Sequence, residues 1–82
     1  MKNKNSITTQ LSSYEKAYKE TKNFDEFKAN IYNVIIDIES IAPITPSYSS
    51  YLFNLKLDCE NLDRFGVDNM LLSLKAFLEK LE

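Results

Sequence analysis

The stretch of sequence that decides the fold runs from residue 23 to residue 46 and reads NFDEFKANIYNVIIDIESIAPITP. Asn23 is followed three residues later by Glu26, a capping-box spacing that predicts a helix start at Asn23. The β-branched and aromatic residues between positions 31 and 36 make a strand the competing interpretation. The cap and the long helical period favour a helix, which should end near Ala42 because the residue before a proline leaves helical geometry. Its broad apolar face comprises Phe24, Phe27, Ile31, Val34, Ile35, Ile38 and Ala42.

Two prolines separate this helix from the next one. Pro43 and Pro46 frame the clearest linker in the chain. Thr45 is placed to cap a third helix with Pro46 in its first turn, where the missing N–H of proline costs nothing. Phe65 and Gly66 predict the end of that helix, with Gly66 as a left-handed C-cap. Its apolar stripe at helical spacing comprises Tyr48, Leu52, Leu55, Cys59 and Leu62.

Two further helices complete the predicted set. Asp68 is placed to cap a fourth helix, whose apolar stripe comprises Leu71, Leu74, Leu78 and Leu81, widened by Met70 and Phe77. A first helix is predicted from about Ser6 to Lys22, with an ion pair between Glu15 and Lys19 on its solvent side. The narrow apolar stripe of this first helix comprises Ile7, Leu11, Tyr14 and Tyr18.

The connections between helices one and two and between helices three and four are short, which favours antiparallel neighbours. The predicted fold is therefore all-α: a single domain over residues 1–82 that forms an antiparallel up-and-down four-helix bundle. Residues 1–5 are expected to be frayed. A three-helix core with the amino-terminal helix added to it is the alternative arrangement.

Composition bears on the class of function. The 82-residue chain has a formal net charge of −2, no histidine and a single cysteine, Cys59. Without histidine there is no Ser-His or Cys-His pair and no histidine metal site. Cys59 falls on the apolar stripe of the third helix, where a buried and unreactive thiol is expected. We therefore expect no enzyme, no cofactor, no metal, no small-molecule substrate and, with Arg64 as the only arginine, no nucleic-acid partner.

Some apolar residues lie off the main stripes and are candidates for contact with a protein partner. Phe53 and Leu57 fall almost opposite the apolar face of the third helix, and Leu72 falls off the stripe of the fourth. Tyr32 and Ile36 do the same on the second helix. Middle helices of a small bundle also bury more than one face, so packing is the competing interpretation. The candidate partner-binding residues are Phe53, Leu57, Leu72 and Lys75, the last being one of two cations on the fourth helix.

The layout of the helices resembles that of a known family, the immunity proteins for pediocin-like (class IIa) bacteriocins of the enterocin A immunity type. The similarity covers nearly the whole chain and consists mostly of apolar spacing. The segments that carry it are residues 10–14, residues 32–41, Pro46 and Ser47 before residues 52–55, and Arg64 and Phe65 followed by Leu71, Leu72 and Leu74.

This resemblance implies a cytoplasmic four-helix bundle that protects the producing cell against its own bacteriocin. In that family the partner is a membrane sugar-transport permease, the mannose phosphotransferase permease, with the bacteriocin bound to it. The carboxy-terminal half, here the third helix, the Gly66 turn and the fourth helix, would set which bacteriocin is countered. The protein would then be cytoplasmic or peripheral at the inner face of the membrane, as a monomer or weak dimer. The sequence itself contains no apolar run of the length of a signal peptide or membrane helix.

Two other functions remain open at this point. One is an inhibitor or antitoxin encoded by a phage or mobile element, which would bind a host or toxin protein. The other is a small structural module that dimerises through Phe53, Leu57 and Leu72.

Overall fold

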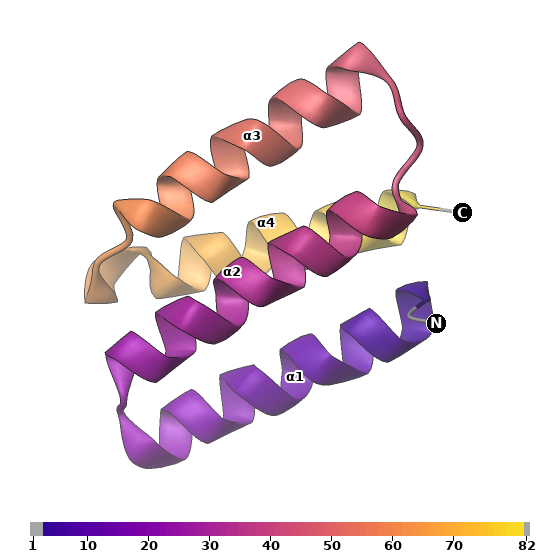
Figure 1. Ribbon diagram of the computed structural model, residues 1–82. Helices are drawn as coiled ribbons and strands as arrows, with labels where there is room; N and C mark the ends of the chain where they lie inside the picture. The colour runs from indigo at the N-terminus through magenta and orange to yellow at the C-terminus, as the bar shows by residue number, and fades with distance from the viewer. Residues whose placement is uncertain (1–2, 82) are drawn as a thin grey trace.

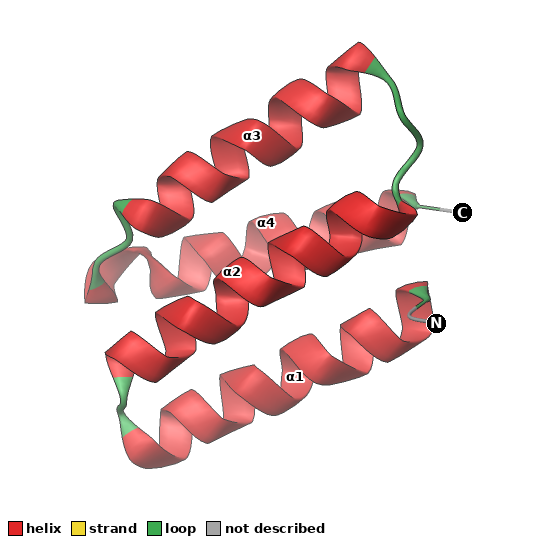
Figure 2. Ribbon diagram, in the orientation of Figure 1, coloured by secondary structure: helices red, strands yellow, loops and turns green. Residues whose placement is uncertain are grey.

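The computed structural model describes residues 3–81, and within them every regular element is a helix (Figures 1 and 2). The elements are α1 (Lys4–Thr21), α2 (Phe24–Ile41), α3 (Pro46–Glu60), a short 3-10 helix η1 (Arg64–Gly66) and α4 (Val67–Lys80). No strand occurs in this part of the chain, although residues 31–36 are rich in β-branched side chains. The prediction of an all-α protein with four main helices is confirmed.

The chain doubles back after each main helix, so that the four helices lie side by side (Figure 1). At the first turn, the Tyr18 ring near the end of α1 packs against the Phe27 ring near the start of α2, with ring centroids 4.7 Å apart. At the other end of the molecule, the Lys4 ammonium donates a hydrogen bond of 2.9 Å to the Leu81 carbonyl. The start of α1 therefore lies beside the end of α4, which brings the two ends of the described chain together.

The core draws on every main helix. Helix α1 contributes Ile7 and Leu11, which are at most 1% exposed, so it is a full member of the core rather than an arm added to three other helices. Within residues 3–81 no polar or charged residue is buried. The remaining buried residues are Phe27, Ile31, Val34, Ile35, Ile38, Leu52, Leu55, Cys59, Val67, Met70, Leu71, Leu74, Phe77, Leu78 and Leu81.

Asn23 and Thr45 cap α2 and α3 as predicted, but the capping box at Asn23 is incomplete, because the Glu26 carboxylate accepts from the Asn23 side-chain amide instead of its backbone N–H. The Asn23 side chain accepts a hydrogen bond of 3.1 Å from the Glu26 backbone N–H, and α2 ends with Ala42 as its C-cap. The Thr45 hydroxyl accepts a bond of 3.2 Å from the Tyr48 N–H. Each cap satisfies a backbone donor that the first helical turn leaves without a carbonyl. These local bonds fix where α2 and α3 start along the chain.

The start of α1 differs from the prediction. The helix begins at Lys4, because Asn3 and Ser6 form a reciprocal capping box: each side chain accepts a hydrogen bond of 2.9 Å from the other residue's N–H. The structure thus places Lys4 and Asn5 within α1 and Asn3 at its cap, whereas residues 1 and 2 lie outside the described part; fraying over residues 1–5 stays a prediction. The helix ends at Thr21, followed by Lys22 in the left-handed conformation with φ of 59°.

The turn between α3 and α4 also differs. Gly66 is not a left-handed C-cap: its φ is −88°, and it closes η1 and precedes α4 directly. The Asp63 carboxylate accepts a bond of 2.9 Å from the Gly66 N–H and thereby caps η1. Asp68 is not the cap of α4 but lies in its first turn, where a carboxylate interacts favourably with the helix dipole. The helix begins at Val67 without a side-chain cap, since η1 runs straight into it.

Candidate functional site

The outer side of α3 carries exposed apolar side chains. Leu52 and Leu55 of this helix point into the core, whereas Phe53 is 59% exposed and Leu57 is 41% exposed. Phe53 and Leu57 are one helical turn apart, so they share a face of α3. The structure thus places both sequence-predicted residues of α3 on the surface and next to each other.

Helix α2 adds two more apolar residues to this surface. The Lys56 ammonium of α3 pairs with the Glu39 carboxylate of α2 at 2.7 Å. Phe53 precedes Lys56 by three residues and Ile36 precedes Glu39 by three, so each apolar residue is a surface neighbour of one member of this pair. Ile36 is itself partly exposed. The ion pair therefore brings the exposed faces of the two helices together.

A second contact joins the same two helices one turn further on. The Lys28 ammonium of α2 donates a hydrogen bond of 2.6 Å to the Glu60 carbonyl at the end of α3. Tyr32 lies one turn after Lys28, and Leu57 lies three residues before Glu60. We call the surface made by Tyr32, Ile36, Phe53 and Leu57 the α2–α3 face.

A hollow of about 390 Å³ opens beside this face. Tyr32 and Lys28 line it from α2, and Cys59 and Glu60 line it from α3. The Cys59 thiol is buried and lies 3.5 Å from the Lys28 carbonyl, to which it can donate. Burial raises the pKa of the Cys59 thiol, because the low-dielectric interior disfavours the thiolate. A protonated thiol is a poor nucleophile, so this hollow offers contact surface rather than cysteine chemistry.

The two predicted partner-binding residues of α4 lie elsewhere. The Lys75 ammonium pairs with the Glu15 carboxylate of α1 at 2.8 Å, so this side of α4 faces α1. Leu72 precedes Lys75 by three residues and is 65% exposed on the same side. The structure therefore brings Phe53 and Leu57 together, and separates them from Leu72 and Lys75.

The Glu15 carboxylate is the centre of a small charge network on α1. It accepts from Lys75 and also pairs with Lys19 at 3.1 Å, as the four-residue spacing predicts. The Lys75 ammonium first, and the Lys19 ammonium second, hold the pKa of this carboxyl below its ordinary value. Lys75 is thus engaged in joining α1 to α4.

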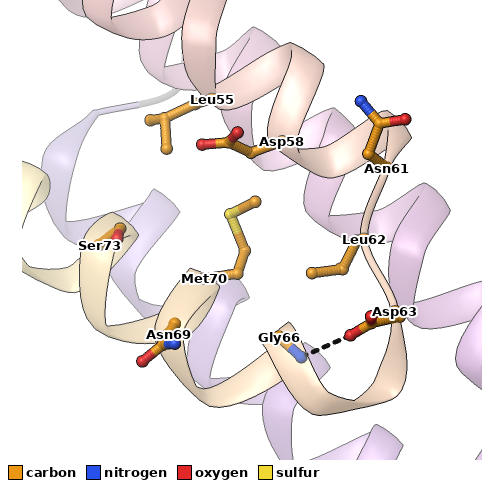
Figure 3. Close-up of a pocket in the computed structure, with 9 residues that line it drawn as sticks. All are labelled: Leu55, Asp58, Asn61, Leu62, Asp63, Gly66, Asn69, Met70 and Ser73. Atoms are coloured by element: carbon orange, nitrogen blue, oxygen red, sulfur yellow. Dashed lines mark hydrogen bonds between the residues drawn. The ribbon is translucent and has the colours of Figure 1, made fainter.

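A groove separates α3 from α4 near the η1 turn (Figure 3). Its volume is about 290 Å³. The two helices are held at the opposite end by the Tyr51 ring, which stacks on Phe77 with centroids 5.0 Å apart. Leu55, Leu62 and Met70 converge on the groove, and the Asp58 carboxylate lies above Met70 (Figure 3). We call this hollow the α3–α4 groove; its other lining residues are Asn61, Asp63, Gly66, Asn69 and Ser73.

Three exposed apolar residues were not among the predicted surface residues, and one of them is Tyr51 of α3, which is 40% exposed. Ile44, in the linker before α3, is 99% exposed, and Phe65, within η1, is 96% exposed. Ile44 and Phe65 lie in connections between helices, and spacing rules describe helices and say little about a single apolar residue in a turn. For Ile44, the position between the predicted helix end at Ala42 and the predicted cap Thr45 is the signal that could have marked it as exposed, whereas Phe65 has no such signal.

Among residues 3–81, no group of three or more Cys, Asp or Glu side chains is placed to hold a metal ion. None of the helices has both the length and the apolar character needed to cross a bilayer. No protein-family model, curated protein or solved structure matches this chain.

Proposed function

We propose that this protein is an immunity protein of the type directed against pediocin-like bacteriocins, and that it acts by contact with another protein rather than by catalysis. Two things support this proposal. The spacing of apolar residues resembles that family along nearly the whole chain, and four helices form in the order that the family layout requires. The absence of histidine from the sequence also disfavours most acid–base chemistry near neutral pH.

The α2–α3 face is the observation that carries the proposal. Its four residues include a phenylalanine and a tyrosine, and aromatic side chains supply much of the binding energy at protein interfaces. Phe53 and Ile36 each lie one turn from a member of the Lys56–Glu39 pair, which would supply polar contacts beside the apolar side chains. An apolar surface of this kind on a small protein fits a docking site for a partner.

The partner in this proposal is the membrane sugar-transport permease with its bound bacteriocin. The protein would then work on the cytoplasmic side of the membrane, held there by the permease. This location needs no membrane-spanning helix of its own.

The test is a protection assay in a sensitive indicator strain that expresses the protein and is challenged with a panel of pediocin-like bacteriocins. We expect resistance to one or a few of them. Phe53→Ser should abolish this resistance, because it removes the most exposed side chain of the α2–α3 face. The matched control is Leu72→Ser, which removes an exposed apolar side chain from the α1 side of α4 and should leave resistance intact.

Three outcomes separate the interpretations. Loss of resistance in Phe53→Ser alone supports the α2–α3 face as the contact surface. Loss in Leu72→Ser alone would move the partner to α4. Uniform sensitivity of cells that hold abundant, folded protein would contradict the immunity proposal and favour an inhibitor or antitoxin that binds a different target.

A further inference from the structure

The charged side chains that line the α3–α4 groove are all acidic. Asp58 and Asp63 contribute carboxylates, and no lysine or arginine lines the groove. The ion pairs among residues 3–81 involve Glu15 and Glu39, and neither of the two aspartates takes part in one. The Asp63 carboxylate accepts only the Gly66 N–H bond that caps η1, which is a contact with a neutral donor. The groove therefore holds negative charge that no described cation balances.

The nearest arginine in the sequence is turned away from the groove. Arg64 lies in η1, next to Asp63, but its guanidinium sits 5.5 Å from the centroid of the Phe24 ring on α2. This cation–π contact holds the only arginine of the sequence against α2. Lys56 and Lys75 pair with Glu39 and Glu15 and so face α2 and α1.

The floor of the groove is apolar. Leu55 and Met70 are about 95% buried, and Leu62 is half-buried beside them. Met70 reaches from α4 toward Asp58 of α3 (Figure 3). A ligand in this groove would thus meet aliphatic and thioether surface below and carboxylates at the rim.

We propose that the α3–α4 groove receives a basic side chain of a partner protein, with arginine the best fit. Long basic side chains lay their aliphatic stems on apolar surface while the charged head reaches polar groups. Arginine adds a planar guanidinium that matches carboxylate geometry, and it binds more readily than lysine at interfaces because it is more weakly hydrated. Pockets for whole small ligands hold about 300–1,000 Å³. The groove, at about 290 Å³, lies at the lower end of that range and is large enough for one long side chain.

Other occupants fit less well. A nucleic acid would bring phosphates against Asp58 and Asp63, which repel them. A metal ion would need a denser set of ligands than any that residues 3–81 provide. The proposal concerns a different surface from the α2–α3 face, so it holds or fails independently of the immunity function.

The test uses the whole protein, labelled with ¹⁵N, and two capped pentapeptides that present either arginine or citrulline between leucines. Citrulline has nearly the same shape as arginine but carries no charge. We expect saturable shifts of the Gly66, Asn69 and Ser73 backbone amides with the arginine peptide, and much smaller shifts with the citrulline peptide. The shifts should weaken as salt is raised, because the carboxylates are exposed and therefore screened.

Aspartate-to-asparagine variants show which carboxylates bind the arginine peptide. Asp58→Asn should weaken binding about two- to five-fold, the range expected for an exposed ion pair. Asp63→Asn keeps an oxygen that can accept from the Gly66 N–H, so the double variant with Asp58→Asn should weaken binding further while η1 stays capped. Asp68→Asn is the matched control, because it removes the same charge from α4 outside the groove.

Several results would overturn the proposal. Equal amide shifts with both peptides would mean that the groove binds the peptides through apolar contact alone. If neither peptide produced a saturable shift, the groove would bind neither of them. If Asp68→Asn weakened peptide binding as strongly as Asp58→Asn, the net charge of the protein and not the groove would account for the binding. If the amide shifts of the groove residues changed with protein concentration in the absence of peptide, the occupant of the groove would be a lysine of a second copy of the chain and not a separate partner.

Discussion

Three leucine-to-alanine substitutions measure how the bundle is held together. Leu74 of α4 is fully buried, Leu55 is buried at the floor of the α3–α4 groove, and Leu72 is 65% exposed. The chemical change is the same in all three variants. Each truncation removes about three methylene equivalents, which at about 0.8 kcal/mol each amounts to about 2.4 kcal/mol when the side chain is fully buried.

The surroundings of each leucine set the final magnitude. At Leu74 a cavity remains inside the core, so we expect a loss of about 3–5 kcal/mol. At Leu55 the groove opens the site to water and to movement of Met70, so we expect about 2–3 kcal/mol. At Leu72 the side chain is mostly hydrated already, and the change should stay within about 0.5 kcal/mol.

These losses are large for so small a domain. Stability of about 0.05–0.15 kcal/mol per residue gives about 4–12 kcal/mol for 82 residues. For a domain of this size, 1 kcal/mol moves the unfolding midpoint by about 4–8 °C, so Leu74→Ala should lower it by at least about 12 °C. Urea unfolding followed by far-ultraviolet circular dichroism gives the free energies by linear extrapolation. A loss in Leu74→Ala no greater than in Leu72→Ala would refute the packing of α4 described above.

Three further predictions test local features. Glu15→Gln should lower the free energy of unfolding by less than about 1 kcal/mol, because the ion pairs of Glu15 are near the surface. Since the pKa of Glu15 is lowered from 4.5, these ion pairs should stabilise the fold above pH 4.5 and cease to do so as the pH falls through the lowered pKa. Unfolding measured at several pH values would reveal this loss. Cys59 should react slowly with a thiol reagent in the folded protein and quickly in urea, as its buried thiol and raised pKa require. Gly66→Ala should change the free energy of unfolding by less than about 1 kcal/mol, because φ of −88° suits alanine and the added methyl group meets the flexible end of Leu62 at 3.2 Å and the Asp63 Oδ1 at an ordinary contact distance of 3.6 Å. A larger loss in Gly66→Ala would favour the left-handed conformation that spacing alone suggested.

Helix positions could be predicted from sequence because their signals are local. The cap at Asn23, the pair Thr45 and Pro46, and the apolar stripe of α4 each lie within a few residues, and the structure contains all of them. The η1 turn was missed because two aspartates, Asp63 and Asp68, both precede apolar residues at capping distance. Choosing between them requires knowing that a 3-10 turn leads into α4 without a break, and no spacing rule contains that information.

The candidate surfaces were less predictable for a different reason. Helical spacing shows that Phe53, Leu57 and Leu72 each leave the core, but it does not say which neighbouring helix each one lies beside. That depends on contacts between helices, such as the Glu39–Lys56 pair. Tyr32 and Ile36 therefore join the surface of Phe53 and Leu57, and Leu72 does not.

Helix α3 is the element in which the fold and the proposed interactions meet. A helix that only closed a bundle would need one apolar side, here Leu52 and Leu55, and could be polar elsewhere. Instead α3 presents Phe53 and Leu57 to solvent on one flank and borders the acidic groove at Asp58 on the other. Exposed apolar residues are ordinary when scattered singly, but a cluster backed by a neighbouring helix favours self-association unless a partner covers it. Because α3 contacts the core along a single side, substitutions on its two free flanks can change what the protein binds while the core keeps the bundle folded.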